Sequence, residues 1–168
     1  IGEIRDPETA EYAVRASLVG RLVFSTVHAN SSIGTIARLL DMNIERSLLA
    51  YGINGVISKR LIRKICDSCP TTYTPEPSLV KYFGFEQAEF KKGAGCDVCN
   101  NTGYKGRTSI IEVMEFDEGL RSLILEKAPV TALQGYCETS GNMKTLRQSA
   151  KEKILAGITT AEEAARFV

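Results

Sequence analysis

Residues 20–30 read Gly20-Arg21-Leu22-Val23-Phe24-Ser25-Thr26-Val27-His28-Ala29-Asn30, and the first prediction about the fold follows from this segment. Its apolar run, Leu22-Val23-Phe24, does not alternate with polar residues, which is typical of a parallel strand covered on both faces. Polar residues, among them His28, follow at or beyond the carboxyl end of that strand. Upstream, Ile1 to Asp6 has the pattern of a buried strand whose beginning is missing, so we expect the chain to be a fragment.

A helix is predicted between these two strands. Asp6-Pro7 supplies an N-cap and a proline suited to the first helical position, and Gly20 ends the helix. Between these two ends, apolar residues recur at helical spacing on one face, at Ala10, Ala13, Val14 and Leu18. The order strand, helix, strand predicts an α/β fold with a partial parallel sheet.

Further elements follow from periodicity and caps. A second helix begins at Ser31 or Ser32, a third runs from about Glu45 to Ser58, and strands at Leu61–Ile65 and Arg107–Phe116 are expected to pair. The remainder is predicted to be an all-helical tail, with helices at about 118–127, 130–140 and 144–156 and a last one from Thr159-Thr160-Ala161-Glu162 to the terminus. We therefore divide the chain into residues 1–65, an insert at 66–106, and residues 107–168.

Composition excludes several classes of protein. The chain has 168 residues, 43% of them hydrophobic, and a formal net charge of +1, which is ordinary for a globular domain. This charge gives no general attraction to nucleic acid or to an anionic membrane, so no direct contact with nucleic acid is expected. No apolar run is long enough to span a bilayer and no leader is present, so we expect a cytoplasmic protein.

Four of the five cysteines form two C-x-x-C pairs, Cys66 with Cys69 and Cys96 with Cys99. Two such turns can converge on one ion, and four thiolates complete the tetrahedral shell of a structural zinc. Two reducible dithiols, or unrelated buried cysteines, are the alternatives. A hairpin or a short helix through Leu79 to Phe85 would fit within the spacer. Cys137 is interpreted as a buried thiol without a role.

Two other clusters have structural interpretations. Lys59, Arg60, Arg63 and Lys64 are interpreted as a solvated strand edge, which often carries lysine to block further pairing, and a contact with phosphate is the alternative. Tyr82, Phe83, Phe85 and Phe90 are read as the small core of the insert.

Charged and polar residues follow both predicted strands, Glu3 with Arg5 and Asp6 after the first and His28 after the second. Ligands of doubly wound sheets bind outside the carboxyl ends of the strands. A carboxylate there can orient and deprotonate a water, and an imidazole can contact a phosphoryl group. The alternatives are a surface pair of Glu3 with Arg5 and a structural histidine.

Several motifs together resemble the secretion ATPases of type II secretion and type IV pilus assembly. The segments that carry the resemblance are Gly2-Glu3-Ile4-Arg5-Asp6-Pro7-Glu8-Thr9-Ala10, Ser25-Thr26-Val27-His28-Ala29-Asn30, Lys59 to Cys66, Gly103 to Thr108 with Glu112, Met143 to Leu146, and Gly157 to Glu163. They occur in order and span nearly the whole chain. Val27 and Ala29 stand where leucine and threonine are commoner in that family.

The resemblance implies a RecA-like core, with Glu3 as the catalytic carboxylate of the Walker B segment and His28 near the γ-phosphate. We also predict a nucleotide contact for Arg5. The four cysteines match the zinc element of the assembly and secretion branches. The full protein is expected to use ATP and Mg, to form a homo-hexamer, and to act on an inner-membrane platform protein at the inner face of the cytoplasmic membrane without spanning it.

One motif of such enzymes is missing. No G-x-x-x-x-G-K-[ST] phosphate-binding loop occurs in the 168 residues, so we expect it upstream of Ile1 and predict that the fragment alone hydrolyses no ATP. A non-enzymatic zinc-ribbon module that binds protein or nucleic acid is the alternative function. It accounts for the cysteines but not for Glu3 and His28.

Overall fold

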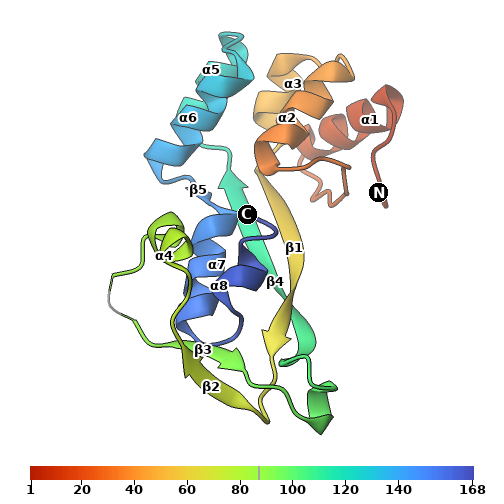
Figure 1. Cartoon of the computed structure of the whole chain (residues 1–168). Coiled ribbons are helices and arrows are strands. Elements are labelled where there is room, and N and C mark those ends of the chain that lie inside the picture. The colour runs from red at the N-terminus through yellow and green to blue at the C-terminus, as the bar shows by residue number, and fades with distance from the viewer. Residues whose placement is uncertain (87) are drawn as a thin grey trace. The chain divides into compact units, whose positions relative to one another are not determined.

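The structure is a computed structural model that describes residues 1–86 and 88–168, and it is a mixed α/β fold (Figure 1). The elements are α1 (Pro7–Leu18), α2 (Ser32–Asp41), α3 (Arg46–Gly52), β1 (Gly55–Ile65), β2 (Pro70–Tyr73), α4 (Pro77–Phe83), β3 (Phe90–Gly93), the 3-10 turn η1 (Asp97–Cys99), β4 (Tyr104–Glu115), α5 (Glu118–Leu125), α6 (Val130–Ser140), β5 (Met143–Lys144), α7 (Leu146–Leu155) and α8 (Ala161–Ala164). No helix in the described ranges combines the length and apolarity needed to cross a membrane.

The strands form two small sheets. One has the order β1-β4-β5, and β5 pairs antiparallel with β4 so that Val113 lies opposite Lys144. The other is an antiparallel pair of β2 and β3, in which Tyr73 lies opposite Phe90. The chain divides into two compact units, residues 1–58 with 112–144 and residues 59–111 with 145–168. The three divisions fall within β1, within β4 and between β5 and α7.

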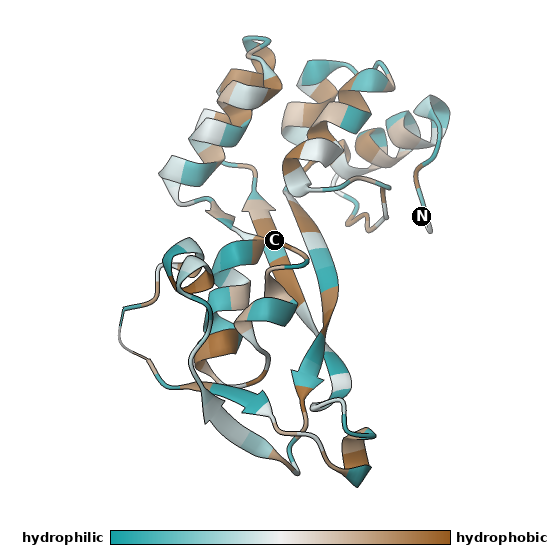
Figure 2. Cartoon of the chain, in the orientation of Figure 1, coloured by the Kyte–Doolittle hydropathy of each residue, from teal (hydrophilic) through white to brown (hydrophobic). Residues whose placement is uncertain are grey.

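The first unit is built from amphipathic helices. Helix α1 starts where Asp6 accepts the N–H of Thr9 at 2.8 Å, and α5 starts where Asp117 accepts the N–H of Leu120 at 2.8 Å. Apolar and polar residues are mixed along each helix (Figure 2), so each can turn one face to a core. That core contains the fully buried Ile36, Leu49, Leu120, Ile124, Leu133 and Cys137.

In the second unit the carboxyl-terminal helices complete the core of the cysteine-containing insert. Phe83, Phe85 and Phe90 are buried, as predicted, together with residues of β1, β4, α7 and α8: Ile62, Ile110, Ala150, Ile154, Ala161 and Ala164. Tyr82 is 44% exposed and lies outside this core, which corrects the prediction for that residue. The insert therefore shares its core with α7 and α8.

The α/β class is confirmed, but two predicted strands are absent from the described residues. Residues 1–5 and 22–24 have no strand assignment, and Leu22 and Phe24 are 80% and 77% exposed, not covered. The two segments still run together, since the N–H of Ile4 donates to the carbonyl of Thr26 at 2.8 Å. An apolar run predicts a strand that is buried under other elements. In the described residues this run is neither a strand nor buried.

Two further predictions need correction. The helix predicted over 45–58 ends at Gly52, and β1 begins at Gly55, because glycine is a poor helix former and Val56-Ile57 favours a strand. The tail is not all-helical, since β5 interrupts it, and the last helix ends at Ala164 instead of the terminus. The segments predicted as paired strands, 61–65 and 107–116, belong to the neighbouring strands β1 and β4. Strand β1 lies at the edge of its sheet, as its basic residues indicated.

Candidate functional site

The first candidate site joins the segments that precede α1 and α2. Glu3 comes from the first segment and His28 from the second, and the backbone hydrogen bond between Ile4 and Thr26 holds the segments side by side. The hydroxyl of Thr26 adds a hydrogen bond of 2.9 Å to the carbonyl of Gly2. The sequence therefore folds so that an acid and an imidazole, 25 positions apart, meet in space.

Glu3 is the centre of this site. Nε2 of His28 lies 2.6 Å from its Oε1, and Nε of Arg5 donates to its Oε2 at 2.6 Å. The Glu3 side chain is 22% exposed, whereas that of His28 is 89% exposed. The hydrogen bond from Arg5 lowers the pKa of Glu3, and the partial burial of the carboxylate opposes this without cancelling it. The carboxylate is therefore ionised at neutral pH and able to accept a proton or orient a donor.

The contact of Glu3 with Arg5 is also expected if the two residues are only a surface ion pair. That alternative does not account for the contact of Glu3 with His28. From the sequence, Asp6 was placed beside Glu3 and Arg5. In the structure its carboxylate instead caps α1, where it accepts hydrogen bonds from the N–H and the hydroxyl of Thr9. A cation, an ionised acid and an exposed imidazole thus share one small region. Such a set can orient water at Glu3 and contact an anionic group with Arg5 and His28.

Sequence reasoning named a buried acid of the same unit only as part of the resemblance and gave it no role. Glu112, on β4, is 8% exposed, and its Oε1 accepts the N–H of Ser32 at 2.8 Å in the first turn of α2. Helix α2 begins four residues after His28, so Glu112 anchors the helix that follows the histidine segment. The partners are 80 positions apart, so no local pattern could have signalled their contact.

The second candidate site is the tetracysteine cluster, formed by Cys66, Cys69, Cys96 and Cys99. Their four Sγ atoms lie within 4.8 Å of one another. Three Sγ–Sγ distances are short: 3.9 Å for Cys66 with Cys96, 3.9 Å for Cys69 with Cys99 and 3.7 Å for Cys96 with Cys99. Four sulfurs at about 2.3 Å from one tetrahedral zinc would be about 3.8 Å apart. The cluster therefore has the donor set and the spacing of a metal site, as predicted.

Backbone contacts hold the two turns of the cluster together. The N–H of Cys66 donates to the carbonyl of Gly103 at 2.9 Å, and the N–H of Ala94 donates to that of Cys69 at 2.8 Å. Gly93 and Gly103 pack backbone to backbone, so that a Cβ on Gly93 would lie 2.0 Å from the carbonyl oxygen of Gly103. Only glycine permits this approach.

The Cys99 sulfur is prepared to carry negative charge. Burial raises the pKa of its thiol, but hydrogen bonds from the N–H groups of Cys96 and Gly103, each 3.3 Å away, have the larger combined effect. The pKa of Cys99 is lowered to about 6 as a result. A thiolate is the form that ligates a metal. Cys137, by contrast, is fully buried, as predicted, and burial raises its pKa to about 11.

Comparison with known proteins places this chain in one class, the proteins of type II and type IV secretion systems. Residues 1–166 match the family described as "Type II/IV secretion system protein". The chain belongs to this family.

Two relatives illustrate the match. The type II secretion system protein E of Pseudomonas aeruginosa is 42% identical over 99% of this chain and 33% of its own length. The type IV pilus assembly ATPase PilB of Thermus thermophilus is 39% identical over 97% of this chain and 19% of its own length. The chain thus spans a third or less of these two relatives.

Among solved structures, the ATPase DotB of Legionella pneumophila has a similar fold, with a TM-score of 0.65 at 21% identity over 98% of this chain and 36% of that one. At this identity the likeness concerns the fold alone.

Proposed function

We propose that this chain is the carboxyl-terminal part of an ATPase that powers type II protein secretion or type IV pilus assembly. Two relatives that match nearly the whole chain are named as a type II secretion protein E and a pilus assembly ATPase. Because the chain spans only part of their length, the phosphate-binding loop that the 168 residues lack belongs, in this proposal, to the remainder of the protein. The 168 residues alone then hydrolyse no ATP.

The observation that carries the proposal is the 2.6 Å contact between His28 Nε2 and Glu3 Oε1. In the proposed mechanism Glu3 orients the attacking water and accepts its proton, and His28 contacts the γ-phosphate. Each carboxylate oxygen has two lone pairs, so water can reach Glu3 while Nε2 of His28 stays beside Oε1. Arg5 keeps Glu3 ionised through Oε2 and supplies positive charge toward the nucleotide, while Mg²⁺ in such enzymes neutralises the phosphates.

The exposed apolar residues of the histidine segment agree with this proposal. Leu22 and Phe24 are more than three-quarters exposed, although the pattern around them is that of a covered strand. The rest of a RecA-like core would supply this cover. In this proposal the full protein is a homo-hexamer at the cytoplasmic face of the inner membrane, and it passes the work of hydrolysis to a platform protein.

The tetracysteine cluster is proposed to hold one structural zinc. Four sulfurs leave no open position for substrate, so the metal would order the second unit and would not take part in hydrolysis.

Turnover of ATP by the full-length protein tests the proposal, with Glu3→Gln as the variant. Glu118→Gln is a matched control, because Glu118 is an exposed acid on α5 and lies outside the segments that carry the family resemblance. The proposal requires that Glu3→Gln loses turnover and that Glu118→Gln keeps it. Equal turnover in the wild type and Glu3→Gln would favour the alternative, a zinc-ribbon module that binds a partner without catalysis.

A further inference from the structure

The near-zero charge of the whole chain conceals two oppositely charged units. The second unit, residues 59–111 with 145–168, has 13 Lys and Arg against 8 Asp and Glu, a net charge of +5. The first unit has 8 Lys and Arg against 12 Asp and Glu, a net charge of −4. A divalent metal held by four thiolates would add about −2 to the second unit, which would stay positive. This unit therefore attracts anionic partners that the whole-chain charge does not predict.

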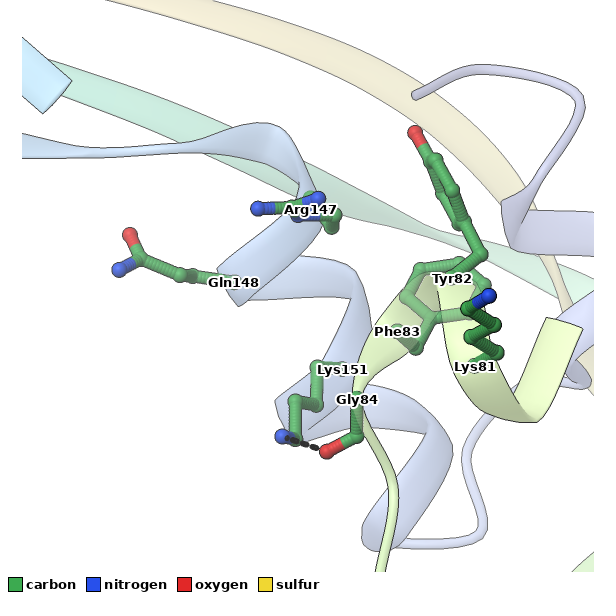
Figure 3. A pocket seen from close by; sticks show the side chains of 7 residues that line it. All are labelled: Lys81, Tyr82, Phe83, Gly84, Arg147, Gln148 and Lys151. Carbon is green, nitrogen blue, oxygen red and sulfur yellow. Dashed lines mark hydrogen bonds between the residues drawn. The ribbon is translucent and has the colours of Figure 1, made fainter.

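Three of the cations of this unit line a pocket of about 380 Å³ between α4 and α7 (Figure 3). Its lining residues are Lys81, Tyr82, Phe83, Gly84, Arg147, Gln148 and Lys151. Three of these seven are cations and none is an acid. Lys81 comes from α4, whereas Arg147 and Lys151 come from α7 and are one helical turn apart.

The three cations retain unused hydrogen-bond donors. The ammonium of Lys151 donates to the carbonyl of Gly84 at 2.5 Å and has two further protons to offer. The guanidinium of Arg147 lies 5.7 Å from the ring centre of Tyr82, a cation–π contact that uses none of its N–H donors. Within residues 1–86 and 88–168, the ion pairs found involve neither these two residues nor Lys81. The guanidinium of Arg147 is a rigid planar group, so less freedom is lost for each hydrogen bond that it forms with a carboxylate.

We infer that this pocket binds an acidic peptide segment, rich in Asp or Glu, of a partner protein. Side-chain carboxylates match the free donors of Arg147, Lys81 and Lys151, and the exposed ring of Tyr82 offers apolar contact to the peptide backbone. A membrane surface is typically bound by clusters of about four to eight basic residues. Duplex DNA is typically held through about six to ten phosphate contacts. Three cations around a small pocket fit a short acidic segment better than either surface. This surface is independent of the proposed hydrolysis at Glu3.

The test uses the zinc-loaded 168-residue chain and a fluorescein-labelled hexaglutamate peptide, whose fluorescence anisotropy reports binding. The variant is Lys81→Gln/Arg147→Gln, which leaves the structural hydrogen bond of Lys151 intact. The matched control is Lys105→Gln/Arg107→Gln, because these two residues are exposed on β4 in the same unit and away from the pocket. Both variants lose one lysine and one arginine, so they have the same net charge. Thermal melting followed by circular dichroism verifies that both fold.

The expected result is saturable binding that the pocket variant weakens about threefold or more, while the control binds within about 1.5-fold of the wild type. Equal weakening by both variants would show general charge attraction and would overturn the inference. Wild-type affinity of the pocket variant would overturn it too. So would tighter binding of single-stranded DNA or of phosphatidylglycerol vesicles, lost in the pocket variant, because the pocket would then select a different class of partner.

Discussion

The buried carboxylate of Glu112 accepts a hydrogen bond of 2.8 Å from the N–H of Ser32, across 80 positions of sequence. Ser32 begins α2, whose first N–H groups have no partner within the helix. The Glu112 side chain also lies at the positive end of the helix dipole. One side chain from β4 thus holds the start of the helix that follows the His28 segment.

Replacing this acid should destabilise the first unit. Glu112→Ala leaves the N–H of Ser32 buried without a partner and should lower the free energy of unfolding by about 1–3 kcal/mol. Glu112→Gln keeps an acceptor oxygen and should lose less. Urea denaturation measures both. Glu115→Gln, at an exposed position of the same strand, is the control and should stay within about 0.5 kcal/mol of the wild type. If Glu112→Ala behaved like this control, the anchoring role of Glu112 would be wrong.

Removing the metal should loosen the second unit. The purified chain should contain about one zinc ion, and a strong chelator should remove it and lower Tm by about 5 °C or more, because the ion binds only the folded state. Elemental analysis and thermal melting measure the two effects. Cys99→Ser should lose the zinc, whereas Cys137→Ser should keep it, since Cys137 lies in the core of the first unit. Full zinc content in Cys99→Ser would contradict a four-cysteine site.

A second prediction for this unit concerns pH. Glu163, on α8, is 3% exposed, and its Oε2 accepts hydrogen bonds from Nε and Nη2 of Arg63 at 2.9 and 2.6 Å. Burial raises the pKa of Glu163, but the hydrogen bonds and the positive charge of Arg63 lower it by more. The pKa of Glu163 in the folded chain therefore lies below 4.5. The ionised form therefore contributes stability above about pH 4.5, and this contribution is lost as the pH falls through the folded-state pKa.

Denaturation at several pH values tests this link. Glu163→Gln should lower the free energy of unfolding by about 1–3 kcal/mol at neutral pH, and this deficit should shrink as the pH falls toward 3. Arg166→Gln is the control, since Arg166 lies 3.5 Å from Glu163 and is 63% exposed, so it should change stability by less than about 1 kcal/mol. A deficit that is the same at neutral and acid pH would show that Glu163 acts through packing and not through its charge.

Local signals in the sequence predicted much of this structure. The caps at Asp6 and Thr160 mark real helix starts, because the capping bond involves neighbours in sequence. The spacing of the cysteines predicted their cluster for the same reason, since each C-x-x-C turn is local and four sulfurs share one task. Glu3 and His28 were grouped because each follows a predicted strand. They do meet, but neither segment is a strand, so the reason given for their meeting was wrong.

Partners distant in sequence could not be predicted. Glu112 and Ser32, Arg63 and Glu163, and the pairing of β2 with β3 each join positions that no local pattern relates. The run Leu22-Val23-Phe24 shows the converse error, because its composition indicates a covered strand but does not say what covers it. The charge of the second unit was hidden for a similar reason: the unit is assembled from two separate stretches of chain, so only the fold reveals its sum.

The most direct test of the central claim, that Glu3 is the catalytic carboxylate, measures ATP turnover and nucleotide binding in the same preparations of the full-length protein. Glu3→Gln keeps the size of the side chain but removes its charge and its capacity to accept a proton. The account predicts that kcat falls about 100-fold or more while the nucleotide Kd changes by less than about threefold. Turnover within about threefold of the wild type in Glu3→Gln, with nucleotide still bound, would contradict the account.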